Sequence, residues 1–120
     1  MIYVQTKLNT ADNSGALKVK CIKVLNNKKI ANIGDSILVS VKKINPKKKI
    51  TKGSLQKGVI VRLKTKVKRF GGYISIGDNA IILLNNQQLP IGTRVLGPIL
   101  RELRLLRQYS KLVSLATYVL

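Results

Sequence analysis

Apolar and polar residues alternate along much of the first 96 positions in short runs that are typical of β-strands. The longest alternation covers residues 59–68. Its apolar parity holds Val59, Val61, Leu63, Thr65 and Val67, and its opposite parity holds Ile60, Arg62, Lys64, Lys66 and Lys68. This pattern predicts one strand with a core face and a mostly cationic face.

A second alternation, from Leu17 to Cys21, places lysines at the two intervening positions and then slips by one residue at Ile22. A bulge or sharp bend there would return Ile22 and Val24 to the core, as closing barrels require. The apolar runs 37–41 and 80–84 each follow a Gly-Asp pair, so they predict buried strands entered by turns.

Short strands separated by regular turn signals favour a small closed β-barrel. After Gly97 the pattern becomes helical, because Pro98 suits a first helical position, Glu102 suits a helix N-terminus, and an apolar stripe follows. That stripe consists of Ile99, Leu103 and Leu106. We therefore expect a mainly β chain forming one domain over residues 1–120, with a barrel and a basic hairpin in residues 1–96 and a short helical segment in residues 97–120.

The charge of the chain adds a partner to this picture. Twenty-three Lys and Arg residues face four Asp and Glu residues, which gives a net charge of +19. Because the basic residues are interleaved with apolar positions, the charge belongs to a folded surface, and a polyanion is the expected partner.

Catalytic and metal chemistry finds little support in the composition. The chain has no histidine, and its one cysteine, Cys21, lies between apolar strand residues and is expected in the core. The carboxylates stand apart at turns or a helix start, and Asp12 before Asn13-Ser14-Gly15 predicts an Asx turn. We expect no catalytic residue, metal or cofactor; a hydrolase built on two distant carboxylates is the remote alternative.

The first six residues match neither a signal peptide nor a presequence, so no cleavable address is expected.

Two basic clusters and one aromatic pair are candidates for RNA contact. The loop cluster is either a solubilising loop or an RNA contact, and it consists of Lys42, Lys43, Lys47, Lys48, Lys49 and Lys52. The strand cluster is the strongest candidate, since alternate side chains are spaced like successive phosphates, and it consists of Arg62, Lys64, Lys66, Lys68 and Arg69. At the expected hairpin tip, Phe70 and Tyr73 flank two glycines, which is either a stacking platform for bases or a glycine turn with one packed ring.

A further basic group lies on one side of the expected C-terminal helix and consists of Arg101, Arg104, Arg107 and Lys111.

Two other functional classes remain as rivals. A free-standing barrel that binds single-stranded nucleic acid would need more than the five aromatic rings of this chain. A peripheral protein on anionic membrane would need an amphipathic helix anchored by aromatic residues.

The chain resembles the universal family of the fourteenth protein of the large ribosomal subunit. Shorter matches lie at 5–6, 8–9, 21–25, 34–35, 61–62, 97–98 and 114–116, and the longest are Ala11-Asp12-Asn13-Ser14-Gly15-Ala16, Leu83-Leu84-Asn85-Asn86, Pro90-Ile91-Gly92-Thr93-Arg94 and Arg101-Glu102-Leu103-Arg104. The matches run in order over essentially the whole chain, which makes the resemblance specific.

This resemblance implies a five-stranded barrel with a short C-terminal helical segment, seated on large-subunit rRNA. It also implies a bridge to small-subunit rRNA, contacts with large-subunit proteins three and nineteen, and a docking place for a ribosome-silencing factor. The residues expected on the bridge and docking surface are Thr93, Arg94, Arg101, Arg104, Lys111 and Ser114.

The bacterial-like pattern and the heavy use of Lys, Asn and Ile suggest a gene from an AT-rich genome. We therefore expect an organelle-encoded protein of the mitochondrial ribosome, with a plastid or an AT-rich bacterium as the alternatives.

Overall fold

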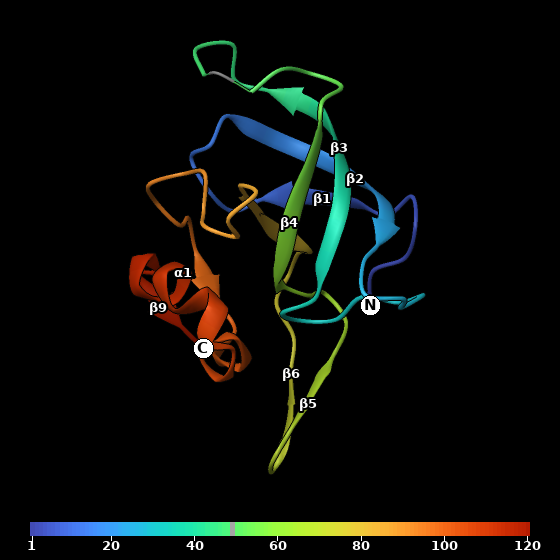
Figure 1. Cartoon of the computed structure of the whole chain (residues 1–120). Coiled ribbons are helices and arrows are strands. Elements are labelled where there is room, and N and C mark those ends of the chain that lie inside the picture. Colours follow the sequence, from blue (N-terminus) through green and yellow to red (C-terminus); the bar gives the residue numbers. More distant parts are fainter. Residues whose placement is uncertain (49) are drawn as a thin grey trace.

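The computed structural model describes residues 1–48 and 50–120, and its core is a small β-barrel (Figure 1). The strands are β1 (Lys7–Thr10), β2 (Ala16–Val24), β3 (Ser36–Ile44), β4 (Leu55–Arg62), β5 (Val67–Arg69), β6 (Gly72–Ile74), β7 (Ala80–Leu84), β8 (Pro98–Ile99) and β9 (Tyr118–Val119). The helical elements are the 3₁₀ helices η1 (Arg101–Leu105) and η2 (Arg107–Tyr109) and the helix α1 (Ser110–Leu115).

Within the described residues, five strands close the barrel in the order β1-β2-β3-β4-β7. Neighbouring strands pair antiparallel, except that β1 and β7 pair in parallel and so complete the ring. The mainly β class, the five-stranded barrel and the short C-terminal helix are therefore confirmed.

The strand β2 contains the expected irregularity. Its pairing with β3 shifts register between Cys21 and Lys23, which confirms the bulge, while Val24 points inward and Ile22 remains 40% exposed. The expectation that Ile22 returns to the core is therefore wrong, because Ile22 is the extra residue of the bulge and has no partner on β3. Cys21 is buried as expected, and burial raises the pKa of its thiol.

Two apolar cores lie on opposite faces of β4 and β7. Ile60 and Ile81 belong to the core inside the barrel, whereas Val59 and Ile82 belong to a second core that contains the buried residues of the C-terminal segment. A strand covered on both faces is apolar at consecutive positions. The single long strand over residues 59–68 is therefore wrong: β4 ends at Arg62, and pairing resumes at Val67 in a separate hairpin.

The C-terminal segment is more broken than its periodicity predicts. Pro98 lies in β8, which pairs in parallel with β9, and the α-helix starts only at Ser110. Ile99 and Leu103 are nevertheless buried in the second core, because β8 places Ile99 there and the 3₁₀ helix η1 places Leu103 there. The helix start near Pro98 is thus wrong. In residues 1–48 and 50–120, no helix has the length and apolar character to cross a membrane.

Candidate nucleic-acid interface

Three adjacent barrel strands bring lysines together in one hollow. In the pairing of β1 with β2, Lys7 lies opposite Lys20, and in the pairing of β2 with β3, Lys18 lies opposite Lys43. With Lys42 these side chains line a cavity of about 400 Å³. We call it the lysine groove, defined by Lys7, Lys18, Lys20, Lys42 and Lys43.

The positive charge of the lysine groove has no internal partner among the described residues, because the carboxylates are engaged elsewhere. Asp35 pairs with Lys28, Asp78 with Arg62 and Glu102 with Arg69. The fourth carboxylate, Asp12, is buried and accepts hydrogen bonds from Ser14 and from the Leu83 amide. Like charges directly opposite each other destabilise a sheet. The arrangement therefore costs stability in the free protein, and an external polyanion would relieve it.

The sequence predicted only part of the groove. Lys42 and Lys43 were expected RNA contacts, whereas Lys7, Lys18 and Lys20 were not. The alternation of Lys18 and Lys20 with buried Val19 and Cys21 was visible in the sequence. What the alternation could not supply was the register that places these lysines opposite those of β1 and β3.

The connection from β3 to β4 lies at one end of the barrel (Figure 1). The side chains of Lys47, Lys48 and Lys52 are exposed there, and Lys49 lies outside the described residues. The Asn45 amide donates a hydrogen bond of 2.8 Å to the Gly15 carbonyl, which attaches the start of this connection to the turn after β1.

The strand cluster does not form the continuous cationic face that was expected. Arg62 is only 9% exposed, so its expected place beside Lys64 on an exposed face is wrong. Its Nη2 donates to Asp78 Oδ2 at 3.2 Å, and its Nη1 donates to the Leu96 carbonyl at 2.9 Å. Nε lies 3.1 Å from Asp78 Oδ1 but is not aligned for a hydrogen bond, so that contact is ionic. Arg62 thus fastens β4 to the chain before β8.

The hairpin β5–β6 projects from the barrel at the end that lies opposite the β3–β4 connection (Figure 1). Phe70 is fully exposed at its tip, and Tyr73 is two-thirds exposed. The alternative, a glycine turn with one packed ring, is therefore wrong, because neither ring is packed against the protein. A stacking role for these rings stays a prediction. Lys64, Lys66 and Lys68 are also exposed.

Arg69 points back into the protein instead of joining an exposed phosphate-binding face. Its Nη2 donates to Glu102 Oε2 at 2.9 Å and to the Leu120 carbonyl at 2.6 Å, and its Nε also contacts Glu102. Through these bonds Arg69 lowers the pKa of Glu102 below its ordinary value. Its expected place in the exposed strand cluster is therefore wrong, since the guanidinium holds the hairpin to the C-terminal segment.

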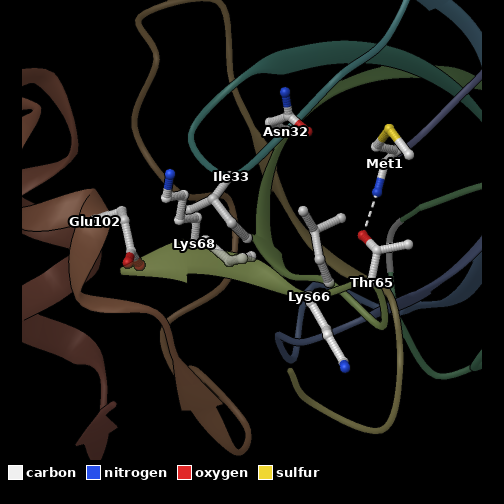
Figure 2. Close-up of a pocket in the computed structure, with 9 residues that line it drawn as sticks. Met1, Asn32, Ile33, Thr65, Lys66, Lys68 and Glu102 are labelled. Carbon is white, nitrogen blue, oxygen red and sulfur yellow. Dashed lines mark hydrogen bonds between the residues drawn. The ribbon is translucent and has the colours of Figure 1, made fainter. Parts of the chain in front are cut away.

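A cavity of about 410 Å³ lies at the base of this hairpin, and Figure 2 shows its lining. The Met1 amine donates to Thr65 Oγ1, and Lys66 and Lys68 share the cavity with the Glu102 carboxylate. A carboxylate and several apolar walls make this hollow less suited to phosphate than the lysine groove. In the described part of the chain, no group of three or more His, Cys, Asp or Glu side chains is placed to hold a metal ion.

The turn 11–16 is built around Asp12, as the sequence predicted. Asp12 Oδ1 accepts hydrogen bonds from the Ser14 amide at 3.3 Å and the Ser14 hydroxyl at 2.7 Å, which confirms the Asx turn. Asp12 Oδ2 accepts a third bond from the Leu83 amide at 3.2 Å. Burial raises the pKa of Asp12, although these bonds oppose the shift.

The neighbouring Asn13 positions one part of the expected bridge surface. Its Oδ1 accepts hydrogen bonds from the Thr93 amide at 2.8 Å and the Arg94 amide at 3.0 Å, and its Nδ2 donates to Thr93 Oγ1 at 2.9 Å. A side chain at Gly92 would meet Asn13 Oδ1 at 2.7 Å, so this close approach requires glycine. The loop that presents Thr93 and Arg94 is consequently held in one conformation.

The remaining residues of the expected bridge surface lie on the C-terminal segment. They are exposed, and they are Arg101, Arg104, Lys111 and Ser114. The Ser114 hydroxyl donates a hydrogen bond of 2.6 Å to the Lys111 carbonyl, so the hydroxyl proton is already used within the C-terminal segment.

Comparison with protein families gives one result that covers the whole chain. The family model described as ribosomal protein L14p/L23e matches residues 1–120.

Proposed function

The chain belongs to the family of ribosomal proteins L14p/L23e, structural constituents of the large ribosomal subunit, and from this premise we propose that it holds large-subunit rRNA through the lysine groove. Family membership places the protein in the ribosome, in translation, with rRNA and ribosomal proteins as its partners, and in a structural class rather than an enzymatic one. The whole of residues 1–120 acts in this role as one domain.

One observation carries the proposal: five lysines from three paired strands line a single hollow, and the described carboxylates lie elsewhere. Each ammonium that meets a phosphate releases condensed counterions, which drives binding without reading sequence. The barrel strands fix the spacing of the charges, so the groove selects RNA by shape.

The test is a titration of the protein with an rRNA fragment at graded salt. With five phosphate contacts, the logarithm of the affinity falls with the logarithm of the salt concentration with a slope of about −4. Filter binding measures this slope. A slope near zero would contradict the proposal.

We further propose that the exposed loop at Thr93 and Arg94, together with Arg101, Arg104, Lys111 and Ser114 of the C-terminal segment, bridges to small-subunit rRNA. The hydrogen bonds of Asn13 support this role, because they hold the loop in a fixed position before any partner arrives. The same proposal includes contacts with large-subunit proteins three and nineteen and with a silencing factor. We also propose that the ribosome is mitochondrial, which the Lys-, Asn- and Ile-rich composition supports.

Replacing Arg94 with glutamate is expected to leave the protein assembled in large subunits but to weaken subunit joining. An anion would then face phosphate in a partly desolvated contact, and such like-charge contacts cost several kcal/mol. Sucrose-gradient sedimentation at graded magnesium measures the joining. Arg107→Glu, the same charge change on an exposed residue outside the proposed bridge, is the control. Equal joining by the Arg94 variant and wild type would reject the bridge role.

A further inference from the structure

Two adjoining cavities at the barrel surface differ in chemistry from the rest of this basic protein. They measure about 360 and 340 Å³, and they share Lys57, Leu84 and Asn85. Side-chain amides dominate their polar lining. We call this surface the amide groove, defined by Asn26, Gln56, Asn85, Asn86, Gln88 and Gln108.

The charge of the amide groove is small. Among its described lining residues Lys57 is the one charged side chain, and no carboxylate is present. Leu25, Leu38 and Leu55 supply apolar surface beside the amides. A groove with paired donors and acceptors, apolar walls and one cation suits a flat, polar-edged ligand that carries a single anionic group.

The loop 85–89 presents its amides in a defined way. Asn85 Oδ1 accepts hydrogen bonds from the Gln87 amide at 2.9 Å and the Leu89 amide at 3.0 Å, and the Gln88 amide donates to the Asn85 carbonyl at 3.0 Å. The side-chain Oδ1 of Asn85 is thereby occupied within the loop, and the side-chain NH₂ group has no hydrogen-bond partner among the described residues.

Gln88 adds an independent observation. Its φ is +61°, a left-handed conformation that glycine and asparagine adopt far more readily than glutamine. Backbone strain of this kind is frequent at binding sites, and Asn26, whose φ is +63°, lines the same groove. At this position the glutamine side chain lines the groove.

The far wall comes from a different part of the chain. Gln108 lies in η2, and its neighbour Tyr109 is fixed to the barrel by a 3.0 Å hydrogen bond between its hydroxyl and that of Ser36. The barrel and the C-terminal segment therefore contribute amides to the same hollow.

We propose that the amide groove binds an unpaired adenine nucleotide of rRNA, with its base edge on the amides and its phosphate at Lys57. This inference rests on rRNA being the partner in the proposed function. A side-chain amide whose oxygen and NH₂ group are both unoccupied forms two hydrogen bonds with the N6 and N7 edge of adenine. Gln88 and Gln108 can make this pair, whereas Asn85, whose Oδ1 is occupied, contributes its NH₂ group as a donor. Proteins read RNA sequence mostly at unstacked, single-stranded bases, whose edges are open to such contacts. The lysine groove holds phosphates of any sequence, whereas the amide groove selects a base.

The test is an NMR titration of the isotope-labelled full chain with adenosine monophosphate, and with ribose 5-phosphate as the probe that lacks a base. At millimolar concentrations, adenosine monophosphate is expected to shift the side-chain NH₂ signals of Asn85, Gln88 and Gln108. Ribose 5-phosphate is expected to leave these signals in place. Equal shifts with both probes, or no shift of the three signals, would overturn the proposal.

Paired variants separate the base site from a general loss of structure. Gln88→Gly removes the amide and relieves the left-handed backbone, so the fold is retained. It is expected to weaken adenosine monophosphate binding at least fivefold. Gln87→Gly changes a neighbouring exposed residue that does not line the groove and is expected to have no effect. Equal effects of the two variants would count against the site. The salt-dependent binding of the rRNA fragment, measured on the same variants, reports separately on the lysine groove.

Discussion

Replacing Lys18, Lys20 and Lys43 with glutamine is expected to weaken binding to large-subunit rRNA on the order of 100-fold at physiological salt. Each of the three ammonium groups releases counterions from a phosphate, and each contributes about 0.7 to 0.9 to the salt slope. The slope is therefore expected to fall by about 2 to 3. Filter binding across a salt series gives both values. The fold is expected to persist, because removing the lysines relieves cross-strand repulsion.

The matched control removes the same charge from the hairpin region, with glutamine at Lys64, Lys66 and Lys68. These residues are exposed, but Lys66 and Lys68 share their cavity with Glu102, so a smaller loss is expected. A larger loss in the hairpin variant than in the groove variant would transfer the main RNA contact to the hairpin.

The second large effect concerns stability rather than binding. Arg62→Met is expected to destabilise the protein by about 3 kcal/mol, because it leaves Asp78 without its cation and removes the hydrogen bond to the Leu96 carbonyl. For a chain of this length that cost lowers Tm by about 10 °C. Thermal unfolding followed by circular dichroism measures the change.

A second substitution tests the reason for this loss. Adding Asp78→Leu to Arg62→Met removes the unpaired carboxylate as well, and we expect it to recover part of the stability. If Arg62→Met instead unfolds like wild type and binds rRNA more weakly, Arg62 belongs to the RNA-binding surface after all.

The barrel was predictable because its signals are local. Alternation, glycine turns and the slip at Ile22 each depend on a few consecutive residues, and Asp12 forms its Asx turn with a residue two positions away. The end of β4 was not predictable in this way. Apolar residues at both parities near Ile60 reflect a second core that includes Leu103 and Tyr109, more than forty positions later.

The candidate site was only partly predictable for the same physical reason. Arg62 and Arg69 resemble surface cations in the sequence, and their partners Asp78 and Glu102 are 16 and 33 positions away. The lysine groove depends on pairing register across three strands, which a single sequence does not specify. By contrast, the resemblance carried by the ordered motifs predicted the family that covers residues 1–120.

The central claim is that the lysine groove is the main contact with rRNA, and protein–RNA crosslinking in purified large subunits tests it most directly. Peptides carrying a crosslinked nucleotide are identified by mass spectrometry and assigned to residues. Crosslinks are expected to concentrate at Lys7, Lys18, Lys20, Lys42 and Lys43. Large subunits that contain the protein but yield crosslinks at the hairpin or the C-terminal segment, and none at these five lysines, would contradict it.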